Sequence, residues 1–206
     1  MGMIKLPDGA IDFFKENQDK VFETGVLAEG SWNQQVQKWI SEYTDSKSAL
    51  ATSSNGTGLL SVLQALKFAK GYEHIFLQSN TMYGMKTLAI SSGLELVGFV
   101  NCTLKSLMPT LESLKEFVLG LDHPDKCVFL LTHIGGWVNP EIDDIANLCK
   151  EEGIALVEDC AHSLGATLHG RHTGTYGEAG VYSLYATKAI PVGEGGIVVT
   201  NNEELG

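Results

Sequence analysis

Short apolar runs that alternate with helical patterns constrain the fold of this chain more than any other feature. Cys127–Leu131 and Ile154–Val157 are uninterrupted apolar runs, and Glu95–Val100 is largely apolar. Strands of this kind are buried on both faces, as in parallel sheets covered by helices. Leu111–Leu119 and Asp143–Glu152 read as helices between these runs. The alternation predicts an α/β domain with three layers, αβα, and a mostly parallel sheet.

Length and composition set the broad class of protein. A chain of 206 residues, 44% hydrophobic and 19% charged, is typical of one soluble domain with a sizeable core. Its 14 basic and 25 acidic residues give a net charge of −11, which argues against nucleic acid or an anionic membrane as a partner. No apolar run reaches the roughly 18–20 residues of a membrane span, and Met1–Pro7 lacks a signal-peptide core, so we expect a cytoplasmic protein. Four scattered cysteines without a CxxC motif predict reduced thiols and no metal site: Cys102, Cys127, Cys149 and Cys160.

The amino-terminal part of the chain reads as helical. Gly9–Thr24 predicts a helix, and Gly25–Trp32 is a glycine-bounded loop in which Trp32 either lines a substrate pocket or anchors packing. A second helix follows, and its apolar residues at helical spacing predict an inward face: Val36, Trp39, Ile40 and Tyr43.

Lys188 is the single charged residue of the run Val181–Lys188. Val181–Tyr185 reads as a strand, Pro191 and Gly193–Gly196 break regular structure, and Ile197–Thr200 resumes as a strand. Apolar neighbours at such a junction disfavour an ammonium ion, so the amine of Lys188 can be a nucleophile near neutral pH, as a Schiff-base lysine must be. A surface lysine in an ordinary turn is the alternative.

Asp159 follows the apolar strand Ile154–Val157, at the end where open α/β sheets bind ligands. A strand, an Asp and a later lysine on a glycine-flanked turn resemble a pyridoxal-phosphate enzyme. The sequence from about Leu27 to Asn202 resembles the nucleotide-sugar aminotransferases of the DegT/DnrJ/EryC1/StrS family. Four stretches carry that resemblance: Val157–Ala166, Gly170–Gly177, Tyr182–Lys188 and Glu194–Gly196.

The resemblance implies pyridoxal 5′-phosphate as cofactor and a role for each matching residue. Lys188 would bond the cofactor as a Schiff base and then move a proton, and Asp159 would pair with the pyridine nitrogen. His162, at the family's Gln/His position, would contact the phenolic side of the ring. Ser183, five residues before Lys188, matches the serine that reaches the phosphate.

Asn55–Gly58 joins the expected strand Lys47–Ser54 to the expected helix Leu59–Lys70. A glycine-rich turn before a helix makes an anion cradle, because backbone N–H groups and the positive helix end face the ligand. An ordinary helix cap explains the same pattern. The resemblance assigns Asn55, Gly56 and Thr57 to the cofactor phosphate, although Asn55 stands where the family usually has Ser.

Two further positions depart from the family pattern or stay open. Met82 stands where the family usually has an aromatic residue stacked on the cofactor, and Tyr83 beside it is the alternative. His133 ends the strand Cys127–Thr132, and it is either a structural histidine or a residue that supports the cofactor site.

The resemblance implies an aminotransferase that moves an amino group from an amino acid, expected to be glutamate, to a keto-sugar nucleotide. One alternative is a pyridoxal-phosphate sugar dehydratase of the same fold, a branch that replaces the lysine with histidine, which Lys188 argues against. Another is a non-catalytic, half-length relative that acts in regulation or protein interaction.

Full-length family members continue into a smaller carboxyl-terminal domain, whereas this chain stops soon after Lys188. We therefore expect residues 1–206 to be the large cofactor-binding domain of an aspartate-aminotransferase-like fold (fold type I), with the small domain missing. The complete protein is expected to be a homodimer, with Trp32, Trp39 and Trp137 contributing contact surface.

Overall fold

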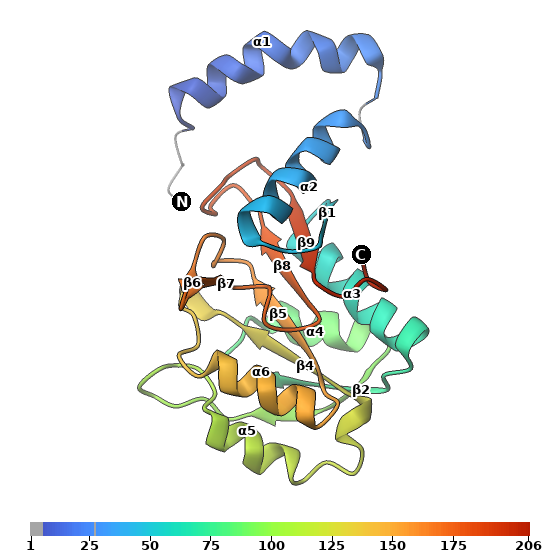
Figure 1. The fold of residues 1–206 in the computed structure, drawn as a ribbon, viewed down its shortest axis with the longest axis vertical. Helices are drawn as coiled ribbons and strands as arrows, with labels where there is room; N and C mark the ends of the chain where they lie inside the picture. The colour runs from blue at the N-terminus through green and yellow to red at the C-terminus, as the bar shows by residue number, and fades with distance from the viewer. Residues whose placement is uncertain (1–5, 27) are drawn as a thin grey trace.

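A seven-stranded sheet in the order β1-β9-β8-β5-β4-β2-β3 organises the computed structural model, which describes residues 6–26 and 28–206 (Figure 1). The five strands from β8 to β3 are parallel, and β9 is antiparallel to both of its neighbours. The prediction of a mostly parallel sheet is confirmed. The strands are β1 Ser48–Thr52, β2 His74–Gln78, β3 Glu95–Val100, β4 Cys127–Thr132, β5 Ala155–Cys160, β8 Ala179–Ser183 and β9 Gly196–Thr200, with a small hairpin of β6 Thr167–Leu168 and β7 Arg171–His172.

Helices cover both faces of this sheet. The helix α3 and its neighbour α4 share one buried cluster with the sheet, whereas α5 and α6 pack on the opposite face, which α2 also covers at β8 and β9. These three layers confirm the predicted αβα architecture. The helices are α1 Asp8–Thr24, α2 Ser31–Thr44, α3 Asn55–Lys70, α4 Tyr83–Ser91, α5 Leu111–Val118 and α6 Ile142–Glu151, with short 3-10 turns at Pro124–Lys126 and Ile134–Gly136.

The side chains of β5 show why its sequence is continuous and apolar. Val157 packs into the cluster beneath α3, and Leu156 packs into the cluster beneath α5 and α6. Successive side chains of a strand point to opposite faces, so both faces of β5 are buried. The same alternation sends Asp159 to the α3 face and Glu158 to the other face, each from a fully buried strand.

The amino-terminal helices differ from the expectation. Figure 1 shows α1 standing apart from the sheet, and none of its residues is buried. In α2 only Ile40 of the expected inward face is buried, while Val36, Trp39 and Tyr43 stay exposed. That prediction was wrong for these three residues. Trp39 stacks on Tyr43 along the helix surface, with ring centroids 5.5 Å apart, instead of entering the core.

Two other predictions concern Trp32 and the absence of signal and membrane-spanning segments. Trp32 lies in α2 and packs edge-on against Phe13 of α1, which supports the packing role. The expected absence of a signal sequence concerns Met1–Pro7, of which residues 1–5 lie outside the described residues. Among the helices of residues 6–26 and 28–206, none is both long and apolar enough for a membrane span.

Two glycines let α3 approach the sheet. A Cβ on Gly58 would lie 2.7 Å from Cγ1 of Val181, and a Cβ on Gly196 would lie 2.4 Å from the carbonyl carbon of Ser54. Any larger residue at either position would push the start of α3 away from β8 and β9. These glycines therefore place the amino end of α3 at the carboxyl edge of the parallel strands.

Candidate active site

Polar residues gather where the parallel strands end. The register aligns Thr132 of β4 with Asp159 of β5, and Asp159 with Val181 of β8. Ser183 ends β8, and Asn55 opens α3 against the same strands. In open α/β sheets this edge is where ligands bind. The structure thus brings Asp159, Asn55 and Ser183, which are distant in sequence, to one edge.

Asp159 is almost fully buried, with 3% of its surface exposed. Its Oδ1 accepts hydrogen bonds from the Asn55 amide at 3.2 Å and from the Ala161 backbone N–H at 3.1 Å. Among the residues that the structure describes, its Oδ2 accepts only a long bond, 3.5 Å, from the hydroxyl of Thr132. One carboxylate oxygen is therefore well satisfied, and the other remains open to a further donor.

Burial raises the pKa of Asp159, because desolvation penalises the charged carboxylate. The Ala161 N–H, the Asn55 amide, His133 and Lys188 each lower the pKa and oppose that effect. A cationic or N–H donor placed at Oδ2 would favour the ionised form further. The protonated pyridine nitrogen of the expected cofactor is such a donor.

Lys188 lies near the tip of the connection between β8 and β9. Backbone bonds from Leu184 to Gly195 and from Ala186 to Gly193 hold this connection as a tight excursion. The Nζ atom of Lys188 is 2.7 Å from Nε2 of His162. Burial lowers the pKa of both groups, and the nearby Lys188 lowers the pKa of His162 further. A neutral amine at this position is the form that a nucleophile requires.

The amino end of α3 offers donors for an anion. Ser54 caps the helix by accepting the Thr57 N–H at 3.1 Å, while the Thr57 hydroxyl accepts the Ser54 N–H at 2.9 Å. In the described part of the chain, the backbone N–H groups of Asn55 and Gly56 have no acceptor. The helix cap expected from the sequence is thus present, and the two N–H groups leave the same turn able to bind an anion, which stays a prediction.

The Ser183 hydroxyl is buried and accepts the Tyr185 N–H at 3.3 Å. Across residues 6–26 and 28–206 it donates to no acceptor, so its proton is available to an anion. Ser183, Gly56 and Thr57 remain predicted phosphate ligands.

Met82 is the N-cap residue of α4 and Tyr83 its first residue, and they are 62% and 78% exposed. The preceding Thr81 hydroxyl lies 2.9 Å from the Thr132 hydroxyl, which links this segment to the Asp159 site. The structure does not distinguish which of the two side chains would cover a bound ring. Met82 stays a prediction, and Tyr83 stays the alternative.

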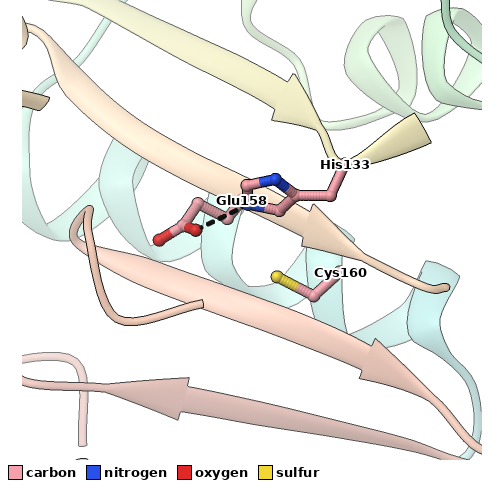
Figure 2. A group of neighbouring side chains, drawn as sticks. All are labelled: His133, Glu158 and Cys160. Atoms are coloured by element: carbon pink, nitrogen blue, oxygen red, sulfur yellow. Dashed lines mark hydrogen bonds and ion pairs between the residues drawn. The ribbon is translucent and has the colours of Figure 1, made fainter. Parts of the chain in front are cut away.

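His133 lies on the opposite side of β5 from the Asp159 carboxylate, in a buried group with Glu158 and Cys160 (Figure 2). Its Nε2 is 2.8 Å from the Glu158 carboxylate, which also accepts the backbone N–H groups of Gly174, Tyr176 and Gly177. Glu158 therefore ties the segment before β8 to β5. This arrangement supports the structural role for His133 and an anchoring role for Glu158.

Three residues of this site escaped the sequence reasoning. Ser54 precedes the helix by one residue and faces Thr57 three positions later, which is the spacing of a capping box. Thr132 is the polar last residue of an apolar strand. Glu158 and Asp159 are consecutive acids on a buried strand, so each had to find its own partners on opposite faces.

The tryptophans expected at a subunit interface lie on the surface in varying degree. Trp137 is 75% exposed and lines a hollow with Lys105 and Ile134. Trp39 is 49% exposed, and Trp32 is partly covered by α1. The four cysteines are free thiols.

Comparison with known proteins matches the model of the DegT/DnrJ/EryC1/StrS aminotransferase family over residues 10–206. The chain belongs to this family. The fold is that of the pyridoxal-phosphate enzymes of fold type I.

Solved structures of similar fold include an aminotransferase from Psychrobacter cryohalolentis, with 25% identity, a TM-score of 0.83 and coverage of 100% of this chain and 50% of that one. The E. coli GDP-4-keto-6-deoxy-D-mannose-3-dehydratase with bound hydrated PLP has 25% identity, a TM-score of 0.85 and coverage of 98% and 51%. DesI in the presence of its TDP-sugar product has 25% identity, a TM-score of 0.80 and coverage of 93% and 47%. The chain thus spans about half the length of these structures.

Proposed function

We propose that this chain is the cofactor-binding part of a pyridoxal-phosphate-dependent aminotransferase that acts on a keto-sugar nucleotide. The observation that carries the proposal is the meeting of a buried Asp159 and a lysine of lowered pKa, Lys188, at the carboxyl edge of the sheet in a member of this family. Glutamate is the expected amino donor. The nucleotide-sugar names of two structural neighbours support the substrate class.

The donor set at the edge fits the proposed cofactor. Asp159 has an open Oδ2 for the ring nitrogen, and Lys188 has an amine for the aldehyde carbon. The unpaired N–H groups of Asn55 and Gly56, with the Ser183 hydroxyl, suit a phosphate. His162, bonded to Lys188, suits the phenolic side of the ring.

The residues of this chain then have separate tasks. When bound, pyridoxal phosphate supplies an electron-withdrawing ring that stabilises negative charge on a substrate carbon. Asp159 keeps a proton on the ring nitrogen, because its buried carboxylate favours a cationic neighbour. Lys188, once its amine is free, removes and returns the proton at the amino-bearing carbon. His162 lies close enough to Lys188 to hold that amine in place.

Two other functions are alternatives to the proposed transamination. A dehydratase neighbour is as similar in sequence as the aminotransferase neighbour, and the lysine at position 188 favours transamination because it is an amine base at the expected position. A non-catalytic relative with regulatory or interaction roles would keep the fold without binding the cofactor.

We further propose a cytoplasmic homodimer for the complete protein, with the exposed apolar face of α1 available for contact.

A half-reaction tests transamination and separates it from the non-catalytic alternative. The complete protein is loaded with pyridoxal phosphate and mixed with glutamate without a second substrate, and 2-oxoglutarate and the visible absorbance are followed. The aminotransferase proposal expects one 2-oxoglutarate per bound cofactor. Cofactor binding without any 2-oxoglutarate from glutamate or another amino acid would overturn transamination, and absence of cofactor binding would favour the non-catalytic relative.

A further inference from the structure

The side chain of Asn55 lies inside the sheet edge, with only 8% of the residue exposed. Its Nδ2 donates to Oδ1 of Asp159 at 3.2 Å and to the carbonyl of Val181 at 2.7 Å. Both partners are acceptors, so chemistry fixes the orientation of the amide with its NH₂ group towards them. Both amide hydrogens are then used within the protein, and neither is left for a phosphate.

The other contacts of Asp159 leave its orientation dependent on this amide. Oδ1 receives the Ala161 N–H as well, but within residues 6–26 and 28–206 Oδ2 receives only the 3.5 Å bond from Thr132. Thr132 is itself held through its backbone N–H, which donates to the buried side chain of Gln78 at 3.0 Å. The carboxylate is thus fixed on its Oδ1 side and open on its Oδ2 side.

We propose that Asn55 is a positioning residue for Asp159, which it orients so that Oδ2 faces the cofactor ring nitrogen. This inference rests on the proposed function and deepens it, since it replaces a side-chain contact to the phosphate with one to Asp159. The contribution of Asn55 to phosphate binding is then its backbone N–H alone. A serine at this position is too short to join Asp159 and Val181 in the same way.

Substitution by Asp separates this role from two simpler ones. Asn55→Asp keeps the shape of the side chain and places a negative charge in the first turn of α3, where the helix dipole favours it. A residue that only fills space or starts the helix would tolerate the change. A residue that donates to Asp159 would not, because two carboxylates would then share one buried site.

The first test measures the titration of the Asp159 carboxyl carbon by NMR in the cofactor-free protein. Asn55→Ala should raise the pKa of Asp159, and Asn55→Asp should raise it further. The titratable groups that interact with Asp159, namely Lys188, His133, His162 and Cys160, remain in both variants. An unchanged Asp159 titration in folded Asn55→Asp protein would overturn the inference.

Asn139→Ala is the matched control. Asn139 is 1% exposed, donates to the Pro109 carbonyl at 2.8 Å and accepts from the Glu141 N–H, so it has a similar buried amide away from Asp159. Asn139→Ala should leave the titration of Asp159 unchanged. An equal shift in both variants would assign the effect to general loss of structure and contradict a specific role for Asn55.

Cofactor affinity gives the second test. Loss of a hydrogen bond to a charged group predicts about tenfold weaker pyridoxal phosphate binding in Asn55→Ala. Asn139→Ala should bind as wild type does. A wild-type protein that does not bind the cofactor would refute the proposed function, whereas the titration would still decide the role of Asn55. Equal affinity in wild type and Asn55→Ala would contradict the inference.

Discussion

Asp159→Asn is expected to stabilise the cofactor-free protein while impairing its function. The substitution removes a negative charge from a residue that is 3% exposed, and it keeps the local hydrogen bonds. The new carbonyl oxygen can accept from Asn55 and Ala161 as Oδ1 does, and the new amide can donate to the Thr132 hydroxyl. What changes is chiefly the desolvation of the charge.

The sign of this change in stability follows from the direction in which the pKa of Asp159 is shifted. Burial raises the pKa of Asp159 above the usual 3.8, so its ionised form costs free energy in the folded state. The general cost of burying an incompletely compensated charge suggests a gain of about 1–2 kcal/mol for the neutral variant at pH 7. The lost attraction to Lys188 subtracts little, because that amine is not deeply buried.

The sign of the pH dependence provides a check. Below pH 3.8 Asp159 is protonated in both states, so it makes no difference to stability. As the pH rises from 3.8 towards the raised folded pKa, the unfolded state loses its proton first, and this destabilises the wild type. The stability difference between Asp159→Asn and wild type should therefore grow with pH and then level off.

Urea unfolding of both cofactor-free proteins between pH 4 and 8 measures this difference. Saturating pyridoxal phosphate should reverse the order, because a ligand at 100 times its Kd stabilises the protein that binds it by about 2.7 kcal/mol. A variant that is less stable than wild type at pH 7 without cofactor, or a difference that does not vary with pH, would refute the reasoning.

Three further changes test other parts of the account. Glu158→Gln places an amide NH₂ group against backbone N–H donors and should lower the free energy of unfolding by about 3 kcal/mol in urea, whereas exposed Glu203→Gln should change it by less than about 0.5 kcal/mol. Gly196→Ala should cost about 1–3 kcal/mol by the same measurement and weaken cofactor binding, because its Cβ would displace Ser54 at the start of α3; wild-type affinity would contradict this. Sedimentation of the complete protein should give a dimer, and substitution of the exposed Phe14 of α1 by Ser should weaken it; a strict monomer would exclude the proposed assembly.

The sequence predicted the sheet well because its strands are buried on both faces. Cys127–Thr132 is buried throughout, so its apolar composition indicated both its conformation and its place. Trp39 shows where this reasoning ends, since a stripe of apolar residues at helical spacing can pack against itself or remain exposed as well as enter a core. The direction of β9 also depends on tertiary pairing that apolar composition does not indicate.

The sequence predicted which residues form the candidate site better than it predicted the contacts between them. Asp159 and Lys188 follow from their positions at strand ends and turns. The direction in which Asn55 points depends on how closely α3 approaches β8. Two glycines that are far apart in the sequence, Gly58 and Gly196, determine that approach. Only the folded structure shows that the amide reaches Asp159.

The central claim is that Lys188 bonds the cofactor at the carboxyl edge of this sheet. The most direct measurement mixes the complete protein with pyridoxal phosphate, reduces the mixture with borohydride and locates the added mass on proteolytic peptides. The account predicts a single dominant modification at Lys188. A large excess of a phosphate analogue without the aldehyde should diminish this labelling, and the Lys188→Ala protein should lack it. Modification spread over several surface lysines, or equal labelling of the Lys188→Ala protein, would contradict it.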